Sequence, residues 1–321
     1  MARQEDGIPT ELRPNPREWN FDVARALGAV AALRVVVPDD AFTAGTLGTE
    51  RAGSAVHVRD GLLLTVGYLI TEAAEVWLRF GDAVVPGHAL AYDQATGFGL
   101  VQALGRVPAP TLEIGDSRRV RPGERVIVAA AGGVASAVAA KVAARQEFAG
   151  YWEYLIEDAL FTVPAHPFWG GAAVIGPDGA LVGIGSLVLQ QGGEGRRVDM
   201  NMAIPTEALQ PILDDLLRYG RTPGPARPWL GLYAMDDDDA LVVGGLADGG
   251  PAERAGVRTG DRILAVNEAE VPDLAGLWRA VWATGTASST VTLTLGRGSR
   301  TLTVPVPAGD RTTFLKAPRM H

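Results

Sequence analysis

Short apolar or alternating runs, separated by glycine and proline, follow one another along the first part of the 321-residue chain. Alternation with a period of two and short valine-rich runs are typical of β-strands. The runs lie at 33–37, 53–65, 75–85, 125–130 and 172–185. Within the last run, "GPDGA" combines a proline that fixes φ with a glycine that permits positive φ, which predicts a hairpin turn. The first part is therefore predicted to be all-β.

Helical periodicity appears in this part at 205–220, "PTEALQPILDDLLRYG". Thr206 is a candidate N-cap, leucines recur at helical spacing, and Gly220 can end the helix. The following segment, "RTPGPARP" at 221–228, has the proline and glycine content of a short, stiff linker. We expect the first domain to end with this helix.

A second set of elements begins at Trp229. The pattern predicts two strands, a short helix around "PAERAG", the strand "DRILAVN", a helix over 273–283 and two closing strands. This is the pattern of a small α+β domain. The expected division is an N-terminal extension (1–27), a first domain (28–220), a linker (221–228), a second domain (229–306) and a C-terminal tail (307–321).

Composition narrows the classes of partner and site. A hydrophobic content of 47% can build a sizeable core, while the net charge of −8 and the absence of a basic run argue against nucleic acid or an acidic membrane surface as partners. The chain has no cysteine, which excludes disulfides, zinc-thiolate sites and a thiol nucleophile. We see no basic segment typical of a signal peptide, so a chain starting at Met1 is expected to be cytoplasmic.

Four blocks of the first part resemble the HtrA/DegP-type serine proteases of the chymotrypsin fold. They are "GSAVHVRDGLLLT" (53–65), "IGDSRRVRPGERVIVA" (114–129), "GGAAVIGPDGALVGI" (170–184) and "NMAIP" (201–205). The second part, with "WLGL" and "GPAERAGVRTGDRILAVN", resembles the PDZ domain that follows the protease in that family. The resemblance implies a mainly β protein, a chymotrypsin-like double β-barrel followed by a small α+β PDZ domain, and suggests a homotrimer.

The catalytic positions depart from the family pattern. The resemblance places Tyr68 where the family has its histidine, Gly97 where it has its aspartate, and Trp169 where it has its serine. Pro167, which has no N–H, stands at an oxyanion-hole position. An indole nitrogen has no basic lone pair and a phenol is a poor base at neutral pH. We therefore expect a protein that is not an enzyme, in which Trp169 either fills the former cleft or is turned to solvent by a rearranged loop.

Other side chains offer no replacement triad by sequence. His57 is interpreted as a solvent-facing strand residue, His88 as a turn residue and His166 as a loop histidine, with Ser186 in a core-lining strand. No histidine or carboxylate falls at metal-ligand spacing, so neither metal nor cofactor is predicted. The acidic run at 235–239 lacks the spacing of a calcium loop and is interpreted as a solvated hairpin tip.

The PDZ-like part retains a candidate binding site. PDZ domains add an extended peptide to a sheet edge and hold its terminal carboxylate with backbone N–H groups. The resemblance assigns the carboxylate loop to Trp229, Leu230, Gly231 and Leu232, and the edge to the strand continuing through Tyr233. The opposite groove wall is assigned to Leu274, Leu277 and Val281, which share one helix face. The alternative is that this part only packs on the first domain.

The aromatic-rich segment at 147–162, "EFAGYWEYLIEDALFT", has two interpretations. It is either strand and loop packing within the β-barrel or an interaction surface, where tyrosine and tryptophan are favoured. The function expected from the sequence is that of an inactive adaptor or scaffold that binds peptide or protein C-termini. The alternatives are a serine endopeptidase and a structural subunit of a larger assembly.

Overall fold

The computed structural model describes residues 7–192, 197–237 and 240–316. The described chain divides into two compact units: 7–146 with 158–222, and 147–157 with 223–316. Among these residues no helix is long and apolar enough to cross a membrane.

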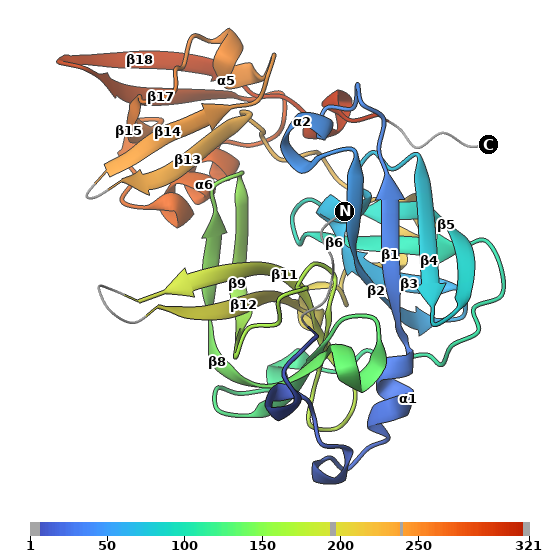
Figure 1. Ribbon diagram of the computed structural model, residues 1–321. Coiled ribbons are helices and arrows are strands. Elements are labelled where there is room, and N and C mark those ends of the chain that lie inside the picture. Colours follow the sequence, from blue (N-terminus) through green and yellow to red (C-terminus); the bar gives the residue numbers. More distant parts are fainter. Residues whose placement is uncertain (1–6, 193–196, 238–239, 317–321) are drawn as a thin grey trace. The chain divides into compact units, whose positions relative to one another are not determined.

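The first unit contains two closed barrels (Figure 1). The first barrel has the strand order β1-β2-β3-β6-β5-β4. Its strands are β1 (Val30–Val36), β2 (Glu50–Arg59), β3 (Leu62–Val66), β4 (Glu75–Phe80), β5 (Ala83–Tyr92) and β6 (Phe98–Ala103). Because Leu63, Leu64, Leu78 and Leu100 are fully buried, the barrel interior is an apolar core rather than an open channel.

The second barrel has the order β10-β11-β12-β9-β8-β7. Its strands are β7 (Arg125–Ala129), β8 (Ala137–Gly150), β9 (Tyr154–Val163), β10 (Ala173–Ile175), β11 (Leu181–Gln191) and β12 (Val198–Pro205). The hairpin predicted at 172–185 is confirmed: β10 and β11 pair antiparallel, and Gly179 in the turn has a φ of 86°. The prediction of an all-β first part holds for both barrels.

Short helical turns connect the strands of this unit. They are η1 (Thr10–Leu12), η2 (Pro16–Glu18), α1 (Val23–Gly28), α2 (Ala44–Leu47), α3 (Gly67–Ile70), η3 (Ser117–Arg119), η4 (Gly133–Ser136), η5 (Thr206–Ala208) and α4 (Leu213–Tyr219).

The helix predicted at 205–220 is shorter than expected. Pro211 lies between η5 and α4, and it cannot donate the backbone hydrogen bond that would join them into one helix. Thr206 does not cap a helix, because its hydroxyl donates to the Gly115 carbonyl at 2.8 Å. Gly220 ends α4 as predicted, in the left-handed conformation with φ 70°.

The second unit contains a six-stranded sheet with the path β13-β14-β15-β17-β18, to which β16 adds beside β15. Its strands are β13 (Leu232–Asp237), β14 (Ala240–Leu246), β15 (Arg262–Val266), β16 (Ala269–Glu270), β17 (Thr290–Arg297) and β18 (Arg300–Pro307). Its helical elements are α5 (Pro251–Arg254), α6 (Leu274–Ala283) and η6 (Arg311–Phe314). The mainly β fold with a small α+β second part is confirmed. Of the acidic run at 235–239, Asp238 and Asp239 lie outside the described residues.

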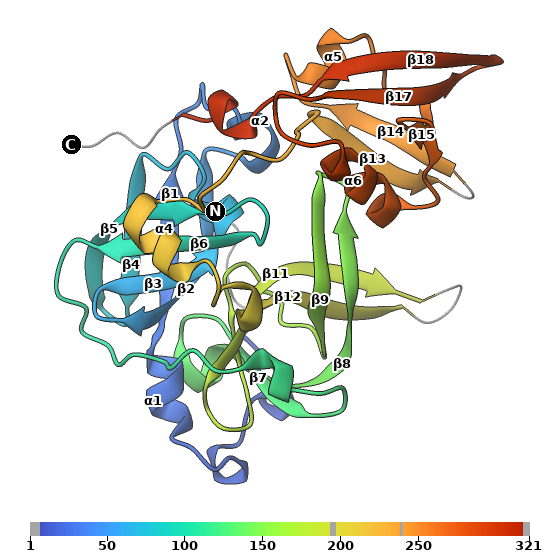
Figure 2. The ribbon, with the colours of Figure 1, turned by 180° about the vertical axis from the view of Figure 1, so that it is seen from behind.

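The hairpin of β8 and β9 takes part in both units (Figures 1 and 2). Its base belongs to the second barrel, whereas its tip, residues 147–157, belongs to the second unit. The expectation that the aromatic segment packs within the barrel is therefore wrong for this tip, which we call the hairpin tip. The alternative, an interaction surface, stays a prediction, because the hairpin tip packs within the second unit.

Candidate catalytic cleft and carboxylate-binding loop

The structure brings the three predicted catalytic positions together around α3. Tyr68 lies in α3, and the N–H of its neighbour Gly67 donates to the Gly97 carbonyl at 2.7 Å. Trp169 lies close enough to Tyr68 to act on the pKa of its hydroxyl. Tyr68, Gly97 and Trp169 therefore lie in one region of the first unit, and their assignment to catalytic positions stays a prediction.

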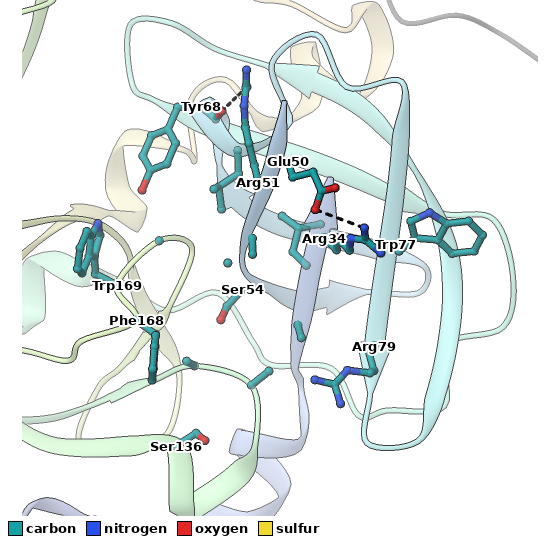
Figure 3. Close-up of a pocket in the computed structure, with 18 of the residues that line it drawn as sticks. Arg34, Glu50, Arg51, Ser54, Tyr68, Trp77, Arg79, Ser136, Phe168 and Trp169 are labelled. Atoms are coloured by element: carbon teal, nitrogen blue, oxygen red, sulfur yellow. Dashed lines mark hydrogen bonds and ion pairs between the residues drawn. The ribbon is translucent and has the colours of Figure 1, made fainter. Parts of the chain in front are cut away.

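Tyr68 serves as an anchor in this arrangement. Its hydroxyl donates to the Ser186 carbonyl at 2.9 Å, and its ring points toward the loop that carries Trp169 (Figure 3). Burial raises the pKa of Tyr68 above its ordinary value, although the neighbouring Trp169 opposes the shift. Tyr68 therefore stays protonated at neutral pH and holds β11 against α3.

Trp169 lines a pocket of about 1020 Å³ in the first unit (Figure 3). The side chain is half-buried, so it neither fills the cleft completely nor faces solvent freely. Arg34, Arg79, Ser54 and Ser136 are among the other lining residues. Pro167, at the predicted oxyanion position, is exposed and lines the same pocket.

The glycine pair after Trp169 is required by the neighbouring strand. The Gly170 carbonyl accepts a hydrogen bond from the Ser54 N–H at 2.8 Å. Gly171 has a φ of 75°, and a Cβ added there would lie 1.9 Å from the Ser54 carbonyl oxygen. The close approach of β2 therefore explains the second glycine without reference to catalysis.

His57 and His88 lie in environments that differ from those expected. His57 was expected to face solvent, but only 3% of it is exposed: its Nδ1 lies 3.0 Å from the Pro110 carbonyl and its Nε2 accepts from the Gly61 N–H. His88 lies within β5 rather than in a turn. The difference arises because β5 continues past Gly87 to Tyr92.

His166 is fully buried, and both ring nitrogens have backbone partners. Nδ1 accepts from the Phe168 N–H at 2.9 Å, so Nε2 carries the proton and donates to the Ser136 carbonyl at 3.0 Å. Burial lowers the pKa of His166, which keeps the ring neutral. Ser186 is buried in β11, as expected.

A carboxylate that the sequence reading did not single out lies close to Gly97. Asp93 is 6% exposed, and its carboxylate accepts from the Thr96 N–H at 2.8 Å and the Thr96 hydroxyl at 2.7 Å. The backbone carbonyl of the same residue, Asp93, accepts a hydrogen bond from the Gly97 N–H. Asp93 therefore closes the turn that presents Gly97.

The second candidate site is the loop at the start of β13. The N–H groups of Leu230, Gly231 and Leu232 all donate to Oε1 of Glu153, at 3.1, 2.7 and 3.0 Å. Gly231 has a φ of 70°, which lets successive N–H groups converge. The loop assigned to a peptide carboxylate thus holds a carboxylate of the hairpin tip.

Glu153 of the hairpin tip is buried against this loop, with 5% of the residue exposed. Burial raises its pKa to about 7, while the three N–H bonds and the charge of Arg311 act in the opposite direction. Burial is the largest of these effects. Placing the charged form of Glu153 here therefore costs free energy that the three N–H bonds offset only in part.

The hairpin tip also contacts the strand edge and α6. The Ala234 N–H of β13 donates to the Tyr151 carbonyl at 2.9 Å, and Trp278 Nε1 of α6 donates to the Gly150 carbonyl at 2.8 Å. The Tyr151 ring contacts the Tyr233 ring with centroids 6.1 Å apart. Loop, strand and helix therefore all engage the same short segment.

The residues of α6 assigned to the groove wall are buried in a cluster against which Ala149 of the hairpin tip also packs, and their role in a groove stays a prediction. Leu277 and Val281 are fully buried in the core of the second unit, and Leu274 packs against that core. Trp229 packs on Phe314, with ring centroids 4.7 Å apart. The amphipathic pattern marked the core face of α6, because apolar spacing identifies burial and not the identity of the buried partner.

Sequence reasoning missed Glu153 and Trp278 as site residues. The aromatic density of 147–162 was the available signal, and it favoured an interaction surface only as an alternative. Glu153 adjoins two of these aromatic residues, Trp152 and Tyr154, whose rings stack at 5.4 Å.

Comparisons with known proteins match the two parts separately. A trypsin-like peptidase domain family matches residues 53–184, and a PDZ domain family matches residues 228–307. A probable periplasmic serine endoprotease DegP-like of Pseudomonas putida (strain W619) is 23% identical over 241 residues, covering 69% of this chain and 49% of that protein. The serine protease Do-like HtrA of Lactobacillus helveticus is 23% identical and covers 79% and 67%. The chain spans about half the length of the first of these relatives.

Solved structures share the fold. The HtrA-type protease AlgW with decapeptide aligns with a TM-score of 0.52 at 21% identity, covering 92% of this chain and 98% of that one. The serine endoprotease from Yersinia pestis aligns with a TM-score of 0.51 at 20% identity, covering 90% and 96%.

Two expectations from the sequence are contradicted by these comparisons. The expectation that the chain is not an enzyme is overturned because its relatives are named serine endoproteases. The expectation of a cytoplasmic protein is overturned because several of the relatives are named periplasmic.

The family matches, the curated relatives and the fold agree with the order of the two units along the chain. The protein is therefore similar to HtrA-type proteases in fold and domain order, with a segment that matches trypsin-like peptidase domains followed by one that matches PDZ domains.

Proposed function

We propose that this HtrA-like protein binds the C-terminal segments of peptides or proteins through its PDZ domain and acts as an adaptor or scaffold. One observation carries the proposal: three consecutive N–H groups, from Leu230, Gly231 and Leu232, converge on one carboxylate oxygen. Such a cluster of backbone donors is a site for an anionic oxygen.

The position of the loop supports the same proposal. The loop leads directly into β13, which is the first strand on the path of its sheet. An extended peptide held by its carboxylate at 230–232 would run along β13, where the Ala234 N–H already donates to a neighbouring segment.

The test is the dependence of binding on the peptide carboxylate. Peptides with an apolar C-terminal residue are expected to bind the full chain at least about tenfold more tightly as free acids than as C-terminal amides, because amidation removes the charge from three hydrogen bonds. Isothermal titration calorimetry of acid and amide pairs measures the ratio. Equal affinities would contradict a role for the loop, and no affinity for either form would favour a structural subunit.

Serine endopeptidase activity is the second candidate function, and the names of the relatives favour it. Trp169 cannot itself supply the nucleophile, since indole nitrogen only donates hydrogen bonds. In that case a hydroxyl of the pocket must act, and the described lining includes Ser54 and Ser136. Casein turnover that an active-site-directed phosphonate abolishes, with the label on a pocket serine, would support this candidate; absence of turnover and label would contradict it.

Location and assembly complete the proposal. The names of the relatives favour a periplasmic location, which cell fractionation tests. A homotrimer without nucleic-acid partners is proposed, and sedimentation of the full chain with and without DNA tests both statements.

A further inference from the structure

The hairpin tip contacts the loop at 230–232, β13 and α6, the elements of the PDZ domain assigned to peptide binding. Its Glu153 carboxylate lies on the N–H groups of 230–232, its Tyr151 carbonyl accepts from β13, and its Gly150 carbonyl accepts from Trp278 of α6. We propose that the hairpin tip is a built-in ligand of the carboxylate-binding loop, and that an external peptide C-terminus binds only by displacing it. This inference rests on the proposed peptide-binding function and assigns a regulation to that site.

The backbone at Glu153 is shaped for this role. Glu153 has a φ of 60°, a left-handed conformation that is unfavourable for a residue other than glycine. The conformation lets an internal residue present a carboxylate where a peptide would present its chain end. A glycine at this position would satisfy the turn better, so the local strain is explained by what the side chain binds.

An ion pair extends the contact beyond the three backbone elements. Arg279 of α6 pairs with Glu147 at the base of the hairpin tip, where both side chains are partly exposed. Exposed pairs contribute little to stability. The carboxylate of Glu153, which is 5% exposed, therefore supplies the main polar anchor.

Linkage within one chain makes such a ligand an effective competitor. A tethered ligand faces its site at an effective concentration on the order of millimolar. The apparent affinity for an external peptide therefore equals the intrinsic affinity multiplied by the fraction of molecules in which the loop is free. Removing the internal carboxylate should raise the apparent affinity for an external one.

The experiment compares the full-length wild type with Glu153→Gly and with the control Glu157→Gly. Glycine at 153 keeps the left-handed turn without strain and removes the carboxylate. Glu157 is an exposed residue of the same hairpin tip, so the control removes the same kind of side chain elsewhere. The probe is the heptapeptide QEFAGYW, the sequence of residues 146–152, with a free C-terminal carboxylate after the residue that precedes Glu153.

Glu153→Gly is expected to bind the free-acid heptapeptide at least about tenfold more tightly than wild type, a difference typical of a charge-assisted hydrogen-bond cluster. Glu157→Gly is expected to match wild type. Equal, measurable affinities of all three proteins for the free acid would overturn the built-in ligand but leave peptide binding intact. If no protein distinguishes the free acid from its amide, the proposed peptide-binding function fails, and the inference fails with it.

A measurement on the unmodified protein covers the case in which Glu153→Gly does not fold. Saturating the wild type with the free-acid heptapeptide should increase amide hydrogen exchange in 147–157 while 230–234 stays protected. Unchanged protection of 147–157 in the peptide-bound protein would overturn the inference, because both ligands would then be bound at once.

Discussion

At the scale of single residues, Glu153 links pH to stability. Its pKa is raised to about 7 by burial, whereas a solvent-exposed glutamate titrates near about 4.3. The folded state therefore holds this proton more tightly than the unfolded state. The resulting stabilisation is fully present below the unfolded pKa and is lost as pH rises through about 7.

We predict that wild type loses up to about 3 kcal/mol of unfolding free energy between pH 4.5 and pH 8 through this residue. Urea unfolding at both pH values, for wild type and Glu153→Gly, measures the effect as the difference between the two pH dependences. Arg311 is the charged group that acts on Glu153. Parallel pH profiles of the two proteins would contradict a buried, titrating Glu153.

Trp169 is the second residue whose environment makes a quantitative prediction. The indole is half-buried, so Trp169→Ala should lower the unfolding free energy by about 1–3 kcal/mol, less than truncation of a fully buried tryptophan. Calorimetry of the full chain measures it. The control is Trp77→Ala, since Trp77 is 41% exposed in the same unit and its truncation should change stability by less than about 1 kcal/mol. Equal effects of the two substitutions would show that Trp169 packs no better than a surface residue.

At the scale of elements, the turn before β10 depends on the strand beside it. Gly171→Ala combines a left-handed φ of 75° with a Cβ 1.9 Å from the Ser54 carbonyl oxygen of β2. Gly133 has a similar φ of 67° with nothing within 4 Å of an added Cβ, so Gly133→Ala isolates the conformational effect.

We expect Gly133→Ala to destabilise by about 1–2 kcal/mol and Gly171→Ala by at least about 2 kcal/mol more. Thermal unfolding of the two variants measures the difference. A similar loss in both would mean that β2 can move away from the turn, and that the glycine is needed for its φ alone.

At the scale of the whole molecule, one hairpin belongs to two units. The base of β8 and β9 completes a barrel of the first unit, and the hairpin tip belongs to the second. A ligand that displaces the tip from the loop at 230–232 would therefore act on the second barrel through β8 and β9. The β8–β9 hairpin thus joins the segment that contacts the proposed peptide-binding loop to the second barrel by covalent continuity.

The sequence by itself determined the elements and the fold class. Period-two runs predicted most strands of the first unit, and the "GPDGA" turn predicted the β10–β11 hairpin, because these signals depend on residues close together in the chain. The strands at 98–103 and 137–150 were not singled out. The resemblance then supplied the positions of Tyr68, Gly97 and Trp169, which the structure brings together around α3.

Only the tertiary structure decided what those residues contact. The burial of His57 and the close approach of Ser54 to Gly171 arise between segments far apart in sequence, which local periodicity does not report. The same holds for Glu153, whose partners lie 77 to 79 residues away in the chain. A charged residue in an aromatic hairpin has the sequence pattern of an exposed side chain. Its role as a ligand follows from three N–H groups that come together only when β13 and the hairpin tip have packed.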